Sequence, residues 1–240
     1  MLKAVFFDLD GTLLPMDDKE FTKGYFYMLY EKVKHLGYED MKELISVIND
    51  GTVAMYKNDG KETNEKVFWK LFEGHYGKKV YEHMPVFDDF YSNEFKKTKA
   101  FCGENKLAKD IVKYAKENVG LVVLSTNPVF PLVGTKTRIE FIDMKPEDFD
   151  FITSYENSSY SKPNPQYFIW LMEKFNLKPD EVILFGNNDY EDYACAKKAG
   201  IDCYLAGETL IIHDELKLNP PIIKMDDVIK TIEFEIDRRK

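Results

Sequence analysis

The sequence has few cysteines and no long uninterrupted hydrophobic run. Its three cysteines, Cys102, Cys195 and Cys203, are odd in number and lack CxxC spacing, which argues against a disulfide framework and against a thiolate zinc site. No window approaches the roughly 18 consecutive apolar residues of a membrane span. The N-terminal MLKAVFFDLD reaches acidic residues too early for a signal peptide. These absences predict a cytoplasmic protein with free thiols.

Cationic residues are fewer than acidic ones. The chain has 33 Lys and Arg against 42 Asp and Glu, a formal net charge of −9. A surface that wraps nucleic acid and a polybasic membrane face both need clustered cations, so we expect neither a nucleic acid nor a membrane as partner. Apolar side chains, by contrast, make up 44% of the 240 residues, enough to bury the core of one or two domains.

Short apolar runs alternate with amphipathic segments along most of the chain. The runs predict buried strands at 4–7, 121–125, 149–153, 182–185 and 201–205. Helical spacing predicts helices at 105–118, 135–142, 165–175 and 190–199, followed by a turn, a short edge element and a charged C-terminal helix. Alternating strands and helices favour an α/β fold, here a Rossmann-like parallel sheet with helices on both faces.

One long insertion interrupts this alternation. About 90 residues separate the first strand from the next helix of the pattern, whereas loops in α/β units usually have about 2 to 6 residues. Four stretches of the insertion show i, i+3, i+4 apolar spacing and predict helices at 18–37, 38–59, 64–77 and 81–97. We therefore expect residues 1–14 and 101–240 to form the α/β core domain and residues 15–100 to form an inserted α-helical domain.

Two aspartates follow the first predicted strand. The carboxyl ends of parallel strands form the ligand crevice of an open α/β sheet, so the position of Asp8 and Asp10 favours a functional role. Alternate residues of a strand point the same way, so both carboxylates can face one ligand. Two like charges this close indicate either a bound cation or a raised pKa.

Polar residues also follow the later strands. The run LVVLSTN ends on Thr126 and Asn127, whose hydroxyl and amide groups suit phosphate oxygens. Lys162 in SKPNP is expected just before a helix N-terminus, a favourable place for an anion, and a lysine in such a loop is expected to contribute little to stability. The loop GNNDYED contains Asp189, Glu191 and Asp192, and acidic oxygens facing paired aspartates suit a hard cation such as Mg²⁺.

In this order, the motifs resemble those of the haloacid dehalogenase (HAD) superfamily of phosphohydrolases. DLDGT resembles motif one, with Asp8 in the nucleophile position and Asp10 in the general acid/base position. Thr126 corresponds to the motif-two hydroxyl that binds the phosphoryl group, and Lys162 resembles the motif-three lysine. The NNDYED loop, with Asp192, resembles motif four, and the insertion resembles the family's helical type-one cap.

The resemblance implies a phosphoric monoester hydrolase, a Mg²⁺-dependent phosphatase of a small phosphorylated metabolite. Asp8 would form an aspartyl phosphate, and Asp10 would protonate the leaving group and then activate water. Thr126, Asn127 and Lys162 would hold the substrate phosphate. An acidic residue at the second position of motif one argues for phosphoryl transfer over the dehalogenase branch.

Motif four departs from the family pattern at one metal position. Asp8, Asp10 and Asp192 are the candidate carboxylate ligands, but the longer form of this motif has an acid where this chain has Asn187. Asn187 could offer a neutral carbonyl oxygen, or Asp189 could restore the charge. A chain without either compensation would be a degenerate member that binds phosphate or metal without turnover.

Other functions remain open from the sequence. A phosphosugar mutase of the same family would return the phosphoryl group to its substrate. Response-regulator receivers share clustered aspartates and a lysine but lack the insertion, and a phosphonatase would need a marked lysine in the cap. No pattern names the substrate; the polar candidates on the expected cap helices are Lys23, Tyr27, Asn49, Asp50 and Lys57.

Overall fold

The computed structural model describes residues 1–240 and contains one six-stranded sheet. Its strands are β1 (Ala4–Phe7), β2 (Leu121–Leu124), β3 (Phe151–Ile152), β4 (Val182–Gly186), β5 (Asp202–Ala206) and β6 (Ile222–Ile223). Their spatial order is β3-β2-β1-β4-β5-β6, and every neighbouring pair is parallel. The predicted Rossmann-like α/β core is confirmed, and the short C-terminal edge element is β6.

Strand β1 lies inside the sheet and sets the position of the site. Phe7 pairs with Leu124 of β2 on one side and with Phe185 of β4 on the other. The chain adds β2 and β3 on the first side and then crosses β1 to add β4, β5 and β6. Strand order therefore reverses beside β1, and in open α/β sheets the ligand crevice lies outside the carboxyl ends of the strands at such a reversal.

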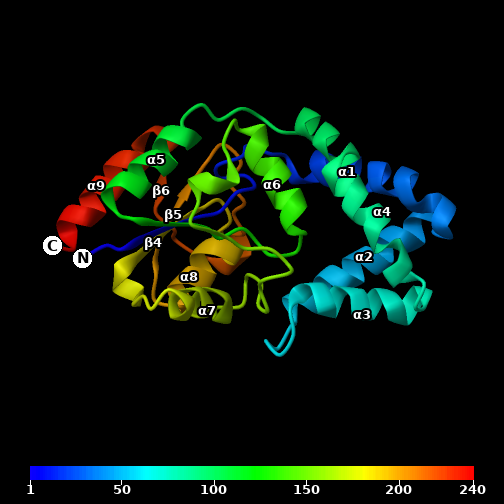
Figure 1. Ribbon diagram of the computed structural model, residues 1–240. Coiled ribbons are helices and arrows are strands. Elements are labelled where there is room, and N and C mark those ends of the chain that lie inside the picture. The colour runs from blue at the N-terminus through cyan, green and yellow to red at the C-terminus, as the bar shows by residue number, and fades with distance from the viewer.

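Helices cover both faces of the sheet (Figure 1). They are α5 (Ala108–Asn118) and α9 (Val228–Arg238) on one face, α7 (Gln166–Lys174) and α8 (Cys195–Lys198) on the other, and α6 (Leu132–Phe141) between the sheet and the inserted helices. Both termini lie at the end of the molecule opposite those inserted helices.

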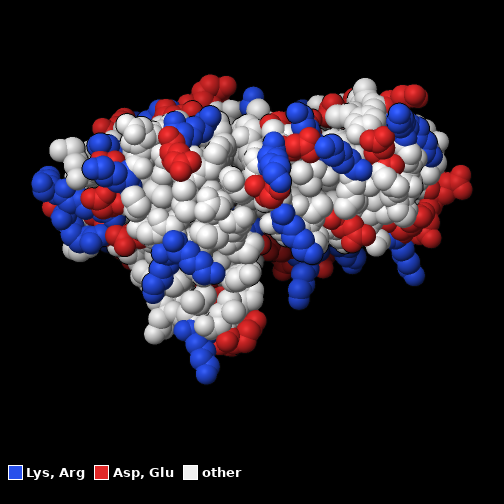
Figure 2. Space-filling model, turned by 90° about the horizontal axis from the view of Figure 1, so that it is seen from below, with Lys and Arg blue, Asp and Glu red and all other residues white.

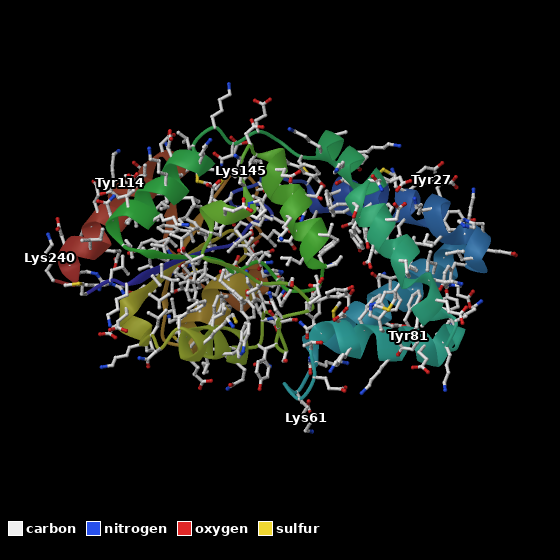
Figure 3. All side chains as sticks on the ribbon, in the orientation of Figure 1. Tyr27, Lys61, Tyr81, Tyr114, Lys145 and Lys240 are labelled. Atoms are coloured by element: carbon white, nitrogen blue, oxygen red, sulfur yellow. The ribbon has the colours of Figure 1, made fainter.

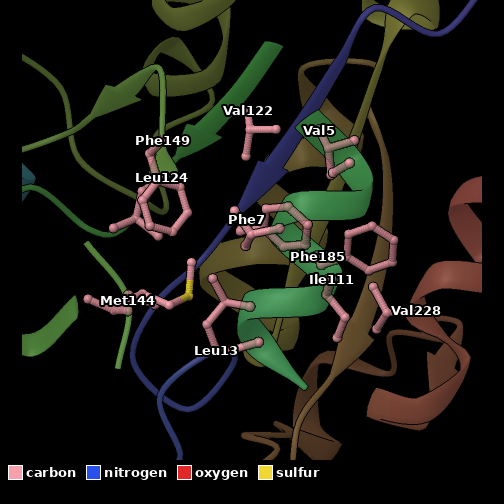
Figure 4. Close-up of a cluster of buried hydrophobic side chains, with 14 of the residues drawn as sticks. Val5, Phe7, Leu13, Ile111, Val122, Leu124, Met144, Phe149, Phe185 and Val228 are labelled. Carbon is pink, nitrogen blue, oxygen red and sulfur yellow. The ribbon is translucent and has the colours of Figure 1, made fainter. Parts of the chain in front are cut away.

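Alternate residues of β1 enter two different hydrophobic cores. Val5 and Phe7 join the core under α5 and α9, and Ala4 and Phe6 join the core under α7 and α8. Figure 4 shows the first core, where Phe7 stacks on Phe185 with ring centroids 5.5 Å apart. Burial on both faces explains why β1 is uniformly apolar and ends abruptly at its first aspartate.

The insertion contains four α-helices around a core of its own. They are α1 (Asp18–Val33), α2 (Met41–Tyr56), α3 (Asn64–Tyr76) and α4 (Val80–Ser92). Side-chain oxygens of Asp17, Asp40 and Thr63 accept hydrogen bonds from backbone N–H groups at the starts of α1, α2 and α3. The core they enclose is largely aromatic, with Tyr25 and Phe72 among its buried members.

Two predicted helices differ from the structure. The segment 81–97 is not one helix, because the backbone leaves helical geometry at Asn93 (φ −123°, ψ −80°) and continues as a 3₁₀-helical segment, Glu94–Phe101. The segment 190–199 begins with a π-helical turn, Asp189–Ala194, before the short α8. Wide turns of this kind are frequent at functional sites.

The surface bears both signs of charge. Lys and Arg side chains are interspersed with Asp and Glu over the face shown in Figure 2, so no extended region of one sign forms there. None of the helices has the length and apolar character needed to cross a bilayer.

Candidate active site

A pocket of about 290 Å³ opens at the carboxyl edge of the sheet, between the core and the inserted helices. Asp8 directly follows β1, Thr126 follows β2 and Asn187 follows β4, so the strand order brings residues from distant parts of the chain together. The polar residues that line it are Asp8, Asp10, Asp18, Thr22, Tyr56, Thr126, Asn127, Arg138, Lys162, Asn187, Asn188, Glu191 and Asp192.

Lys162 bridges two carboxylates in this pocket. Its Nζ donates to Asp8 Oδ1 at 2.8 Å and to Asp192 Oδ1 at 2.6 Å, and the side chain is 1% exposed. Burial alone would lower the pKa of Lys162, but the Asp192 and Asp8 carboxylates raise this pKa well above its usual value. The amide of Asn127 donates to the Lys162 carbonyl oxygen at 3.2 Å and so holds its backbone. Lys162 is therefore a charged, fully paired lysine.

This burial reverses the expectation that Lys162 contributes little to stability. We expect Lys162→Met to lower the free energy of unfolding by about 3–5 kcal/mol, because it leaves two buried carboxylates without their shared cation. Chemical denaturation with a chelator present measures the loss. The exposed Lys109 has no ion pair, and Lys109→Met is expected to change stability by less than about 0.5 kcal/mol. A Lys162→Met loss as small as that of the control would show that the bridge does not stabilise the fold.

Asp8 is buried at the end of β1. It is 6% exposed, and the Thr12 hydroxyl donates to its Oδ2 at 3.2 Å. Burial raises the pKa of Asp8 to about 7, even though the adjacent Lys162 ammonium acts to lower it. The carboxylate is thus held between one hydroxyl and one ammonium.

Asp10 has a different cation. Its Oδ2 lies 3.0 Å from Nη1 of Arg138, a side chain that is 1% exposed, while its Oδ1 is buried without a hydrogen-bond partner. Burial raises the pKa of Asp10, and Arg138 and Lys162 partly offset this rise. The guanidinium of Arg138 also stacks 4.2 Å from the centroid of the Phe130 ring. Separate surroundings therefore distinguish the two aspartates of DLDGT.

Thr126 and Asn127 line the same pocket as these carboxylates. The carbonyl oxygen of Thr126 accepts from Thr153 Oγ1 at 2.7 Å and from the Tyr167 hydroxyl at 2.9 Å, which fixes the backbone here. The backbone N–H groups of Thr126 and Asn127 donate no hydrogen bond within the protein. The Asn127 side chain instead donates to Glu191 Oε2 at 3.0 Å and to Lys162. The donors without a protein partner are therefore these two backbone groups and the Thr126 hydroxyl, whereas the Asn127 amide is already paired.

Close approach explains two glycines of the motifs. A Cβ on Gly186 would lie 2.4 Å from Cγ of Asp192, whose Oδ2 accepts from the backbone N–H groups of Asn187 and Asn188 at 3.0 and 3.1 Å. A Cβ on Gly11, which has φ +79°, would lie 1.9 Å from Nδ2 of Asn187. Gly186 therefore lets Asp192 fold back onto the end of its own strand, and Gly11 lets the loop after β1 pack against Asn187.

Asn187 has a structural reason to be an amide. Its Nδ2 donates to the Thr209 carbonyl oxygen at 2.8 Å, a bond that a carboxylate cannot make. With a chelator present, we expect Asn187→Asp to lower the free energy of unfolding by about 1–3 kcal/mol. Denaturant titration tests this. Asn188→Asp adds the same charge but keeps the oxygen that accepts from Tyr190 and Glu191, so it should be nearly neutral. Equal losses in the two variants would contradict a specific role for the amide.

Asp189 does not reach the pocket. Its carboxylate is buried and accepts from the backbone N–H of His213 at 2.9 Å and from the ring Nδ1 of His213 at 2.5 Å. Sequence reasoning offered Asp189 as a replacement for the missing acid at position 187, and the structure instead pairs it with a histidine 24 residues later. Asp189 is therefore placed to hold the loop through His213, outside the pocket that the other carboxylates line.

The Asp189–His213 pair predicts a pH-dependent stability. The hydrogen bond to Asp189 raises the pKa of His213 above 6.5 in the folded protein. Its stabilisation is therefore complete below pH 6.5 and is lost as pH rises through the raised folded value. We expect His213→Gln to destabilise the protein by up to about 1 kcal/mol near pH 6 and by less near pH 9, because His213 is one-third exposed. Denaturation curves at both pH values check this, and a loss that grows with pH would exclude the ion pair.

The pocket suits a hard divalent cation in charge and in donor type. Its candidate ligand atoms are all oxygens, which Mg²⁺ prefers. Its carboxylates outnumber its cationic side chains: the former are Asp8, Asp10, Asp18, Glu191 and Asp192, and the latter are Lys162 and Arg138. The unpartnered Oδ1 of Asp10 is one oxygen that a cation could satisfy. No three carboxylate, thiol or imidazole side chains converge as a preformed metal cluster. The residues present therefore fit Mg²⁺ chemically, with Lys162 already bridging two of the acids.

Sequence reasoning missed several residues of this pocket. Arg138 lies within a predicted helix, and no local pattern marks it as a residue of the site. Tyr56 and Thr22 line the pocket from α2 and α1, whereas four of the five cap candidates, Lys23, Tyr27, Asp50 and Lys57, do not. Tyr27 points outward from α1 and is 56% exposed (Figure 3). The fifth candidate, Asn49, lines a second pocket described below.

Solved structures with the same fold include enzymes of phosphoryl transfer. A HAD phosphatase from Thermococcus onnurineus superposes with a TM-score of 0.62 at 17% identity, covering 96% of this chain and 98% of that one. A protein assigned as a phosphoglycolate phosphatase from Haemophilus somnus gives 0.57 at 18%, with 96% and 98% covered. A protein assigned as a β-phosphoglucomutase from Thermotoga maritima gives 0.56 at 18%, with 97% and 99% covered.

The family comparison adds a match at the level of sequence. No curated protein matches the chain. The model of the haloacid dehalogenase-like hydrolase family matches residues 5–206, which include every strand-end motif described above. This chain therefore belongs to the haloacid dehalogenase-like hydrolase family.

Proposed function

We propose that this protein is a Mg²⁺-dependent phosphatase that hydrolyses a small phosphorylated metabolite through an aspartyl phosphate on Asp8. Residues 15–100 act as the cap that closes the pocket from one side, contributing Thr22 and Tyr56. The observation that carries the proposal is the buried bridge of Lys162 between Asp8 and Asp192, beside the separately paired Asp10.

Asp8 is the nucleophile in this proposal. Its carboxylate lies at the carboxyl end of β1 in the pocket that Thr126 and Asn127 also line, and the backbone N–H groups of these two residues donate to no protein acceptor. These donors and the Lys162 ammonium are positioned to bind phosphoryl oxygens and to offset their negative charge. In-line attack by the Asp8 oxygen on phosphorus forms the acyl phosphate and releases the leaving-group oxygen.

Asp10 is the general acid and then the general base. Burial raises its pKa and so favours a protonated carboxyl, which can donate its proton to the departing alkoxide. The resulting carboxylate, with Arg138 beside it, can accept a proton from the water that attacks phosphorus in the second step. Two carboxylates in different surroundings meet the requirement for one nucleophile and one acid.

Asp8, Asp10, Asp192 and the Asn187 carbonyl oxygen are the groups that would hold Mg²⁺. The cation supplies positive charge that lowers repulsion between the phosphate ester and the Asp8 carboxylate. The Asn187 amide keeps its Oδ1 available for such a role because its Nδ2 is bound to Thr209. The Lys162 ammonium offsets a further part of the negative charge of the phosphate ester and the Asp8 carboxylate.

A panel of phosphorylated metabolites, assayed for release of inorganic phosphate with Mg²⁺ and with a chelator, tests the proposal. Phosphate release that needs Mg²⁺ supports it. Conversion of a sugar phosphate into its isomer without free phosphate would instead identify a phosphosugar mutase. Binding of phosphate or Mg²⁺ without turnover of any ester would identify a non-catalytic member of the family.

A further inference from the structure

A second pocket, of about 230 Å³, lies beside the catalytic pocket. Helices α1, α2, α3 and α4 form one side, and the segment 129–131 with Tyr155 forms the other. Of its 17 lining residues, 12 are hydrophobic, and the aromatic ones are Tyr25, Phe26, Tyr56, Phe68, Trp69, Phe87, Tyr91, Phe130 and Tyr155. We call it the apolar pocket. It is a hollow at the border of the core of the inserted helices, which shares with it Tyr25, Leu29, Ile48, Trp69, Phe87 and Tyr91.

The two pockets are neighbours with a shared wall. Thr22, Tyr56 and Phe130 line both of them. On the catalytic side, the Arg138 guanidinium lies 4.2 Å from the centroid of the Phe130 ring. On the other side, the centroid of the same ring lies 5.5 Å from that of Tyr25, a residue of the apolar pocket. The apolar pocket therefore lies directly next to the catalytic pocket that contains Asp8, so one ligand of sufficient length would reach both.

The lining of the apolar pocket selects against polar and anionic groups. It contains no lysine or arginine, and its one ionisable carboxyl is Asp88, so nothing there neutralises a second phosphate. The hydroxyls of Tyr25 and Tyr91 lie 2.7 Å apart and bond to each other, so one of their two hydroxyl hydrogens is used within the wall of the pocket. Apolar cavities of about 150 Å³ accept a benzene ring, so this one has room for a ring with a short linker.

We propose that the substrate is a phosphate monoester whose leaving group carries an aromatic or similarly bulky apolar group, which the apolar pocket binds. The inference rests on the proposed phosphatase activity and names its substrate class. It excludes bisphosphates and makes small polyol phosphates poor substrates. The phosphate and the apolar group would be recognised by different residues, so their contributions can be separated by experiment.

The test compares 3-phenylpropyl phosphate with propyl phosphate. Both esters release a primary alcohol, so a difference in kcat/KM measures the phenyl group and not the chemistry of the reaction. Burial of the ring is expected to favour the phenyl ester by about 10- to 100-fold. A kcat/KM ratio near one would overturn the inference and leave the phosphatase proposal intact. If neither ester releases phosphate and other phosphate esters are also inert, the result counts against the phosphatase proposal itself.

Two variants of helix α2 make the comparison specific. Thr52 lines the apolar pocket, and Thr52→Phe is expected to fill it and bring the ratio to within about threefold of one. Val53 is 43% exposed and lies outside the pocket, so Val53→Phe adds a ring to the same helix and should keep the wild-type ratio. Equal ratios in both variants would overturn the assignment.

A binding measurement covers the case in which Thr52→Phe fails to fold or the esters are not turned over. 3-Phenylpropylphosphonate and propylphosphonate are not cleaved, and their affinities for the wild-type protein can be compared by calorimetry. Tighter binding of the phenyl compound, by about 10-fold or more, supports the inference. Equal affinities overturn it, whatever the turnover results.

Discussion

Asp8→Asn is expected to reduce phosphate release by at least about 10⁴-fold, the largest effect of any single substitution in this chain. An amide does not attack phosphorus, and it adds no negative charge to the candidate metal site. The fold should persist because asparagine has the same shape and Lys162 keeps its bond to Asp192. Release of phosphate from an alkyl monoester with Mg²⁺ measures the loss, and thermal melting checks that the variant folds.

A matched control separates this effect from a change of charge. Asp180 is exposed and its side chain makes no hydrogen bond, so Asp180→Asn should keep wild-type activity. Brief mixing with substrate followed by acid quench should trap phosphate on the wild-type chain and none on Asp8→Asn. Activity of Asp8→Asn within tenfold of the control, with the same Mg²⁺ requirement, would remove Asp8 from the nucleophile role.

Asp10→Asn is expected to slow hydrolysis of alkyl phosphates by about 10² to 10⁴, because the alkoxide departs without a proton and water attacks without a base. Affinity for an uncleaved phosphonate, measured with a chelator so that metal binding does not contribute, should change little, since Asp10 is paired with Arg138 and not with the phosphate donors. Steady-state kinetics and phosphonate binding together separate a loss of proton transfer from a loss of binding.

The leaving group gives a sharper version of this test. 4-Nitrophenolate departs without protonation, so the first step of Asp10→Asn should stay fast with 4-nitrophenyl phosphate while the second step stays slow. A burst of about one equivalent of nitrophenolate per enzyme is then expected in stopped-flow measurements. A slow linear release with no burst, or an alkyl phosphate rate close to wild type, would contradict the role of Asp10.

The main features of the fold could be predicted because they depend on local pattern. Each buried strand is a short apolar run, and each predicted strand has a counterpart within two residues at either end. The four helices of the insertion follow from their apolar spacing. Less predictable were the break at Asn93 and the π-helical turn at Asp189, since both depend on contacts outside the segment.

The site could be predicted only in part, for a related reason. The positions of Asp8 and Thr126 follow from strand ends and that of Lys162 from a helix start, and the structure does bring the three residues to one pocket. The ion-pair and hydrogen-bond partners of the site residues cannot be predicted from the sequence, because they depend on which side chains meet in the folded protein. Arg138 beside Asp10 and Asp189 bound to His213 are pairs separated by 128 and 24 residues, with no signal in either neighbourhood.

The sequence by itself determined the order of the strands and helices, the insertion and the chemistry available at each strand end, because hydrophobic period and residue type are local properties. Only the tertiary structure decided which of these side chains pair with each other and how deeply they are buried. The reversal of strand order beside β1 places Lys162 between Asp8 and Asp192, and burial there makes a loop lysine part of the core. The same packing leaves the apolar pocket behind Phe130, since a hollow is a property of the surfaces that meet and not of any one segment.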